Sequence, residues 1–219
     1  MAVNMAVKRA KKAQNRKQVA AQRRKLEVVE SALGGRARRA SLAPIQHCYL
    51  HGDVGEGGMA TVILARGVSP YQFTVAYFLV DALCLGIKDV FVRDLTSEEL
   101  ATFVGAMVEA DSQIAEVDPT YARKLVRSAA GWAATIGFKP PRDFLDIEQI
   151  FGEVDAAACD TAFDFGRNGR PFYIPGPSET PAQIRQRLQR LRSRLGDDGF
   201  EFALGLEDDE PDDTLIEQT

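Results

Sequence analysis

The sequence predicts a single α+β domain, in which helices pack on a mostly antiparallel sheet. Apolar and β-branched runs separated by turn signals fill residues 44–94, and helical signatures follow over residues 95–152. Strand signals return in the last third of the chain. Hydrophobic residues make up 45% of the 219 residues, which is ordinary for a globular protein and sufficient for one packed core.

The charge of the chain is concentrated at its two ends. Residues 1–40 hold twelve Lys or Arg and two acids, whereas residues 197–219 hold ten Asp or Glu and no Lys or Arg. The formal net charge of −4 therefore hides a strongly basic end and a strongly acidic one. We expect a basic arm at 1–40, the folded domain at 41–204 and a disordered acidic tail at 205–219.

The basic arm is predicted to be helical or disordered. Residues 6–33 are rich in Ala, Lys, Arg, Gln and Glu, which favour helix, and Gly34-Gly35 is expected to end it. A dense basic segment attracts polyanions, of which nucleic acid is the commonest in a cell. A solubilising tail, a nuclear localisation signal and a membrane-surface helix are the alternatives.

The first half of the domain is predicted to be β-structure. Residues 44–50 and 59–66 have the composition of strands and are joined by a glycine-rich connection at 52–58. A turn at 68–71 leads to the nearly continuous apolar run at 73–80. Such a run is typical of a central strand with both faces covered.

Helix start and stop signals dominate the next part of the chain. Thr96 and Glu99 form a capping box, and Asp118 followed by proline predicts a second helix that Gly137 ends. A short third helix is expected over 142–151, with Gly152 as its end.

The C-terminal third is predicted to return to strands around one helix. Asn168-Gly169 predicts a hairpin turn between strands at 163–165 and 172–174. A capping box at Thr180 and Gln183 begins an amphipathic helix that ends at Gly196, and 200–204 is a further strand candidate. The apolar stripe of this helix consists of Ile184, Leu188, Leu191 and Leu195.

Cysteine usage and hydropathy indicate a cytoplasmic protein. Cys48, Cys84 and Cys159 form no CxxC pair, which argues against a zinc ribbon or a disulfide framework. The basic N-terminal residues lack the apolar run of a secretory signal. The longest apolar stretch, 73–87, is interrupted by Asp81 and is too short to span a bilayer, so no membrane partner is expected.

Three residues are candidates for catalysis. Asp81 follows an apolar run, where a carboxylate must be paired, hydrogen-bonded or metal-bound, and Asp89 lies downstream. Together they suggest a metal-dependent hydrolase or nuclease centred on Asp81. The alternative is a structural ion pair of Asp81 with Lys88. Cys84 is a separate candidate, either as a thiol nucleophile that His47 or His51 could approach across the sheet or simply as a small buried side chain.

A weak candidate for a metal site is formed by the only two histidines of the chain and a neighbouring aspartate. His47, His51 and Asp53 have even spacing, so an extended strand would place them on one face. Gly52 would interrupt that strand, and the alternative is ordinary edge residues. The identity of any cofactor is left open.

The first functional hypothesis is a nucleic-acid-associated binding protein, with RNA favoured over DNA. Arginine forks and lysines suit phosphates, and aromatics at 163–165 and 172–173 beside Arg167 and Arg170 could stack on bases. A further alternative is a protein–protein adaptor whose charged ends dock partner proteins, so protein partners are left open. The phosphate-binding candidates are Lys8, Arg9, Lys11, Lys12, Arg16, Lys17, Arg23, Arg24, Lys25, Arg36, Arg38, Arg39, Arg187 and Arg194.

Several short blocks of the domain resemble recurring blocks of an uncharacterised bacterial protein family. They are Phe78-Leu79-Val80-Asp81, Cys84-Leu85-Gly86-Ile87-Lys88-Asp89, Gly137-Phe138-Lys139-Pro140 and Gly169-Arg170-Pro171-Phe172-Tyr173. The resemblance covers about residues 42–204 and excludes both charged ends. It implies one intact domain and no known activity.

Overall fold

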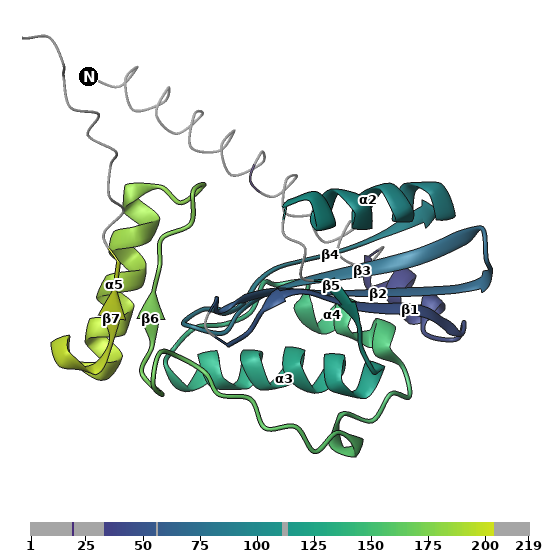
Figure 1. Ribbon diagram of the computed structural model, residues 1–219. Helices are drawn as coiled ribbons and strands as arrows, with labels where there is room; N and C mark the ends of the chain where they lie inside the picture. Colours follow the sequence, from purple (N-terminus) through teal and green to yellow (C-terminus); the bar gives the residue numbers. More distant parts are fainter. Residues whose placement is uncertain (1–18, 20–32, 56, 111–113, 204–219) are drawn as a thin grey trace, which may run out of the picture.

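A five-stranded antiparallel sheet forms the centre of the protein, with strand order β4-β3-β2-β1-β5. The computed structural model describes residues 19, 33–55, 57–110 and 114–203 (Figure 1). The predicted single α+β domain is confirmed. The strands are β1 (Ile45–Asp53), β2 (Met59–Ser69), β3 (Gln72–Asp81), β4 (Gly86–Thr96) and β5 (Ile114–Glu116).

Helices cover both faces of this sheet (Figure 1). The helix α2 (Ser97–Ala110) lies on one face, and α3 (Pro119–Thr135) and α4 (Phe144–Glu148) lie on the other. Short 3-10 turns follow α4, namely η1 (Gln149–Phe151) and η2 (Ala156–Ala158). No helix within the described ranges is both long enough and apolar enough to cross a membrane.

The predicted central position of the run at 73–80 is confirmed. It lies within β3, between β2 and β4, and its side chains alternate between two cores. Phe78 is fully buried on the side of α3 and α4, whereas Val75 is fully buried on the side of α2. Burial on both faces explains why this strand carries almost no polar residues.

The predicted helix starts are confirmed by their capping hydrogen bonds. The amide of Thr96 donates to Glu99 Oε2 at 2.8 Å, and the amide of Glu99 donates to Thr96 Oγ1 at 3.2 Å. The Asp118 carboxylate accepts from the amide of Thr120 at 2.7 Å at the start of α3. These side chains satisfy amides that have no partner within their helices.

A C-terminal unit packs against one end of the sheet (Figure 1). It contains β6 (Phe172–Tyr173), α5 (Pro181–Leu195), η3 (Asp197–Gly199) and β7 (Glu201–Phe202). The amide of Phe172 donates to the carbonyl of Leu83 at 2.9 Å, which ties the unit to the β3–β4 turn. The apolar stripe of α5 packs in the same cluster as Cys84, Leu85 and Phe138.

The predicted hairpin at 163–174 is wrong except for its turn. Asn168 and Gly169 have φ angles of 53° and 77°, as this tight turn requires, and Arg167 pairs with Arg170. Residues 163–165 are not a strand, and β6 instead pairs in parallel with β7. Phe163 and Phe165 pack on Tyr121 and Trp132 of α3, which removes them from the hairpin.

The expected helix end at Gly34-Gly35 is also wrong. Residues 33–40 are helical, and we call this segment the arm-base helix. Its Ala37 is fully buried, and a Cβ atom at Gly34 would lie 3.0 Å from Asp146 Cγ. The small residues therefore serve close packing against α4. The rest of the predicted arm, apart from Val19, and the predicted tail lie outside the described residues.

Candidate nucleic-acid interface

The predicted phosphate-binding residues fall into three groups. Nine of them, from Lys8 to Lys25, lie outside the described residues. Arg36, Arg38 and Arg39 lie on the arm-base helix. Arg187 and Arg194 lie on α5. The five predicted residues that the structure describes therefore lie at two places in the fold, the arm-base helix and α5.

The arm-base helix is fixed to the domain by the buried Arg66 of β2. The Arg66 Nη1 atom donates to the carbonyls of Ser41 at 3.1 Å and Ala43 at 2.5 Å, and Nη2 donates to the carbonyl of Phe151 at 2.7 Å. Ser41 and Ala43 follow the end of the arm-base helix, and Phe151 is the last residue of η1. Partial negative charge gathers at such C-terminal ends. Burial, and then the charge of Arg123, lower the pKa of Arg66.

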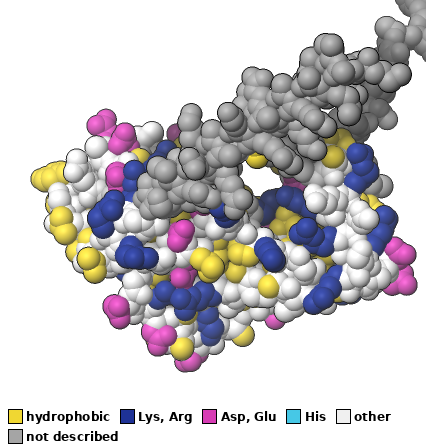
Figure 2. All heavy atoms as spheres, turned by 180° about the vertical axis from the view of Figure 1, so that it is seen from behind, with side chains coloured by type: hydrophobic (Ala, Val, Ile, Leu, Met, Phe, Trp, Pro, Cys, Tyr) yellow, Lys and Arg dark blue, Asp and Glu magenta, His cyan; other side chains and the backbone are white. Residues whose placement is uncertain are grey.

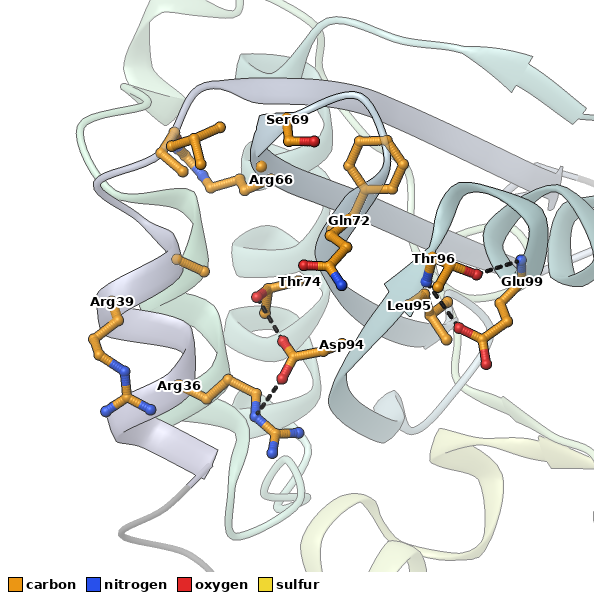
Figure 3. A pocket seen from close by; sticks show the side chains of 15 residues that line it. Arg36, Arg39, Arg66, Ser69, Gln72, Thr74, Asp94, Leu95, Thr96 and Glu99 are labelled. Carbon is orange, nitrogen blue, oxygen red and sulfur yellow. Dashed lines mark hydrogen bonds and ion pairs between the residues drawn. The ribbon is translucent and has the colours of Figure 1, made fainter.

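A pocket of about 650 Å³ opens beside the arm-base helix, and we call it the arm-base pocket. Arg36, Arg39 and Arg66 line it together with Asp94 and Glu99. Figure 3 shows Asp94 between Thr74 and Arg36, with Thr74 Oγ1 at 2.7 Å and Arg36 Nε at 3.5 Å. Arg39 points away from this cluster (Figure 3).

Arg38 and Arg39, the other two predicted arginines of the arm-base helix, have different surroundings. Arg38 donates from Nε to Gln149 Oε1 at 3.0 Å, so it helps to hold the arm-base helix against η1. Arg39 is exposed at the rim of the arm-base pocket. Of the three predicted residues on this helix, Arg39 is the best placed to meet a ligand.

A second cleft of about 340 Å³ lies between α5, the start of β4 and the loop after α3, and we call it the α5 cleft. Four cationic residues line it, and none of its described lining residues is an acid: Lys88, Lys139, Arg187 and Arg190. Its apolar lining includes Leu85, Ile87 and Phe138, which are buried. In Figure 2, basic side chains are visible on the side of the molecule that carries α5.

One buried acid behind the α5 cleft orients two of its cations. The Glu179 carboxylate pairs with Arg187, lies 3.9 Å from Lys88 Nζ and accepts from the Tyr173 hydroxyl. Burial opposes ionisation of Glu179, but the hydrogen bond from Tyr173 and the charge of Arg187 hold its pKa below the usual value. Burial and the bond to Glu179 raise the pKa of Tyr173 to about 12. The cleft thus keeps an excess of positive charge.

The two remaining cations of the α5 cleft lie at its rim. Lys139 and Arg190 are exposed, and the Arg190 guanidinium lies 5.7 Å from the centroid of the Phe138 ring. No acidic partner of either residue is found among the described residues. Their charges are therefore available to a ligand, in contrast to the charge of Arg187.

Other arginines of the C-terminal unit interact within the chain. Arg192 pairs with Asp197 at 3.2 Å, and Arg170 pairs with Glu201 at 3.6 Å. Arg194, one of the predicted phosphate contacts, donates from Nε to the carbonyl of Thr135 at 3.3 Å. Asp197 and Glu201, which follow α5, therefore neutralise part of the basic charge of this unit.

Asp81 is held by backbone amides. Its Oδ1 atom accepts from the amides of Leu83 at 3.0 Å and Cys84 at 2.9 Å, which shapes the turn between β3 and β4. Lys88 is the expected ion-pair partner of Asp81. Among the described residues, the acid that Lys88 pairs with is Glu179, whose Oε1 atom lies 3.9 Å from Lys88 Nζ. Burial raises the pKa of Asp81, while the amide of Cys84 and the charge of Lys88 oppose that rise.

The other two catalytic candidates do not join Asp81 in a cleft. Cys84 is fully buried, and its burial, together with the charge of Asp81, raises the pKa of its thiol. Asp89 is exposed and accepts from the amide of its neighbour Val90 at 2.9 Å. The described residues thus offer no support for a hydrolase at this place.

The weak metal candidates have separate interactions. His47 Nδ1 lies 3.0 Å from the Tyr49 hydroxyl, and His51 Nε2 lies 3.1 Å from the carbonyl of Met107. Asp53 accepts from the amides of Gly55 and Gly57 at the β1–β2 turn. The strand continues through Gly52, contrary to our expectation, yet the described residues contain no group of three or more ligands suited to a metal ion.

Sequence reasoning missed Lys139 and Glu179 and did not distinguish Arg190 from the other arginines of α5. Lys139 lies in a loop, and only the tertiary packing of α5 brings it opposite Arg190. Pro140 and Pro141, which follow Lys139, restrict this loop and were the one local signal of a fixed position. No spacing or motif in the sequence relates Lys139 to Arg190.

No protein-family model matches the sequence, and no curated protein or solved structure gives a significant match. The resemblance to an uncharacterised bacterial family stays a prediction.

Proposed function

We propose that this protein binds nucleic acid, with RNA as its expected ligand, through the basic arm and the basic residues of the domain. The observation that carries this proposal is the attachment of the arm. The arm-base helix is packed in the core at Ala37 and held by Arg66, so residues 1–32 join the domain at a fixed point. The nine basic residues before that point would bring phosphates to a defined surface.

The binding energy would come mainly from charge. Each lysine or arginine that neutralises a phosphate releases condensed counterions, which makes affinity high at low salt and independent of base sequence. Arg39 at the arm-base pocket and the α5 cleft add cationic groups on the folded domain. Phosphate contacts from the basic residues of the arm and from the folded domain would then act on the same strand.

The preference for a single strand over a regular duplex rests on the shape of the basic surface. The cationic residues line two compact pockets, which suit the turned-out phosphates and bases of single strands. A regular DNA duplex is read by an element that enters its groove. Single-stranded RNA, single-stranded DNA and duplexes of the same sequence should be compared directly.

The function is tested by removing the charge of the arm in the full chain. Replacing the nine basic residues from Lys8 to Lys25 by Gln should weaken RNA binding by at least two orders of magnitude at low salt. The matched control exchanges Lys and Arg at the same positions, which keeps every charge. Fluorescence anisotropy with a labelled RNA measures both variants.

Equal affinity of the Gln variant and the unmodified chain would contradict the proposal. Loss of affinity in the exchange control as well would show that residue identity, rather than charge, is required. The hydrolase centred on Asp81 and the adaptor stay hypotheses, since no contact among the described residues favours them.

A further inference from the structure

We propose that the α5 cleft binds a terminal phosphate group, and that its ligand is the phosphorylated end of an RNA strand. This inference rests on the proposed nucleic-acid-binding function and assigns one part of the ligand to one site. The cleft is small, about 340 Å³, which is at the lower end of the range for sites that hold small molecules. A site of this size suits one nucleotide better than a continuous strand.

The charge of the α5 cleft matches a phosphate monoester. Lys88, Lys139, Arg187 and Arg190 line it, and the buried Glu179 behind them compensates for one of these four charges. A monoester carries about −1.5 to −2 charges at neutral pH, whereas an internal phosphodiester carries one. The excess positive charge therefore favours a strand end over an internal phosphate.

The geometry of the cations divides them into fixed and available groups. Glu179 holds Arg187 and Lys88 in place at the base of the cleft, since it pairs with both. Lys139 and Arg190 are exposed to solvent at the rim of the cleft. Lys139 lies in the loop after α3, and Arg190 lies on α5. Hydrogen-bond donors from a loop and from a helix therefore meet in one small space. A phosphate, which has several acceptor oxygens, requires such an arrangement.

The apolar side of the α5 cleft provides for the rest of the nucleotide. Ile87 and Phe138 are buried and line the cleft beside the cations, and Pro140 and Pro141 stiffen its edge. A sugar or base attached to the phosphate would cover the half-buried rings of Pro140 and Pro141 at this edge. Inorganic phosphate alone would leave these rings exposed to water, so we expect a nucleotide to bind more tightly than phosphate.

The α5 cleft and the arm-base pocket lie along the same strand. Lys88 near the start of β4 lines the cleft, and Asp94 near the end of β4 lines the pocket. Six residues separate them on an extended strand, a distance of roughly 20 Å. An RNA strand held by its end in the α5 cleft could therefore reach the arm-base pocket.

The test compares one RNA sequence with and without a 5′-phosphate. The full chain should bind the 5′-phosphorylated RNA about tenfold more tightly than the 5′-hydroxyl form. The double substitution K139Q/R190Q should abolish this preference. R185Q/R192Q is the matched control, because it removes two charges from the same helix at positions outside the cleft and should keep the preference.

Equal binding of the two RNAs by the unmodified chain would overturn the assignment of the α5 cleft while leaving the proposed function in place. Failure to bind either RNA would instead refute the proposed function. In that event, AMP and adenosine are compared by NMR titration. Binding of AMP that K139Q/R190Q abolishes would support the cleft with a free nucleotide as its ligand, and absence of AMP binding would refute it.

Discussion

The Arg187 side chain of α5 pairs with the Glu179 carboxylate, whose side chain is only 8% exposed. Sequence reasoning had assigned Arg187 to phosphate contacts, but its charge is already engaged within the protein. The pair joins α5 to the loop that precedes it and fixes one wall of the α5 cleft. Its role is therefore to position the cleft, and the exposed rim residues Lys139 and Arg190 are the ones that we propose to contact a ligand.

Neutralising Glu179 should destabilise the protein at neutral pH and much less in acid. The pKa of Glu179 is held below its usual value of 4.5, so its stabilising contribution is present above pH 4.5 and is lost as pH falls through the lower folded-state pKa. We expect E179Q to lose about 2 kcal/mol of unfolding free energy at neutral pH, between the values for exposed and buried ion pairs.

Urea unfolding of both proteins across an acid pH series measures this effect. The curves of E179Q and the unmodified chain should approach each other as the pH falls below 4.5. A difference that stays constant down to strong acid would show that the side chain acts through packing and not through its charge.

Replacing Asp81 should distinguish the loss of its oxygen from the loss of its charge. Both amide bonds end on Oδ1, an atom that Asn retains, so D81N should unfold within about 1 kcal/mol of the unmodified chain. D81A leaves two buried amides without an acceptor and should cost about 2–4 kcal/mol.

Denaturant melts of the two variants, with and without Mg²⁺ or Mn²⁺, measure the role of Asp81. Burial raises the pKa of Asp81, so the stabilising contribution of its neutral form is present below the ordinary pKa of 3.8 and is lost as the pH rises through the folded-state pKa. Replacement of Asp81 by Asn should therefore cost less stability at neutral pH than in acid. Metal-dependent stabilisation of the unmodified chain that D81N abolishes would contradict a structural role and would support the hydrolase hypothesis.

Removing the guanidinium of Arg66 should release the arm-base helix. R66M leaves three carbonyls without their donor and should cost about 2–4 kcal/mol of unfolding free energy. R66K keeps the charge but cannot reproduce the fork, so its cost should be intermediate. Hydrogen exchange of amides 33–40 should accelerate in R66M; unchanged protection would mean that the helix is held by Ala37 packing alone.

The native protein should react with thiol reagents mainly at Cys159. Burial, followed by the charge of Asp118, raises the pKa of Cys48 to about 12, and Cys84 is fully buried with a raised pKa. Cys159 is partly exposed. Mass spectrometry after a brief pulse of iodoacetamide tests this, with C159S as control. Rapid native labelling of Cys84 would restore it as a candidate nucleophile.

Features with a local signal could be predicted from the sequence. Capping side chains at Thr96, Asp118 and Thr180 each determine a helix start through bonds within a few residues, so their elements were predictable. The run at 73–80 was predictable as a central strand because burial on both faces excludes polar residues.

Features that depend on distant contacts could not be predicted in this way. The strand β4 was not delimited, because Asp89, Arg93 and Asp94 interrupt its apolar pattern, and an edge strand tolerates such charges. The Asn168-Gly169 sequence determines only the tight turn. The positions of the preceding aromatic residues, Phe163 and Phe165, depend on their packing against α3. The α5 cleft joins Lys139 to Arg190, which no sequence spacing relates.

The most direct test of the central claim is the salt dependence of RNA binding. For single strands, each neutralised phosphate contributes about 0.7 to the slope of log K against log salt concentration. If the arm carries the affinity, the full chain with Gln at the nine basic positions from Lys8 to Lys25 should show a slope several units flatter than the unmodified chain. Equal slopes for the two proteins would contradict nucleic-acid binding through the arm.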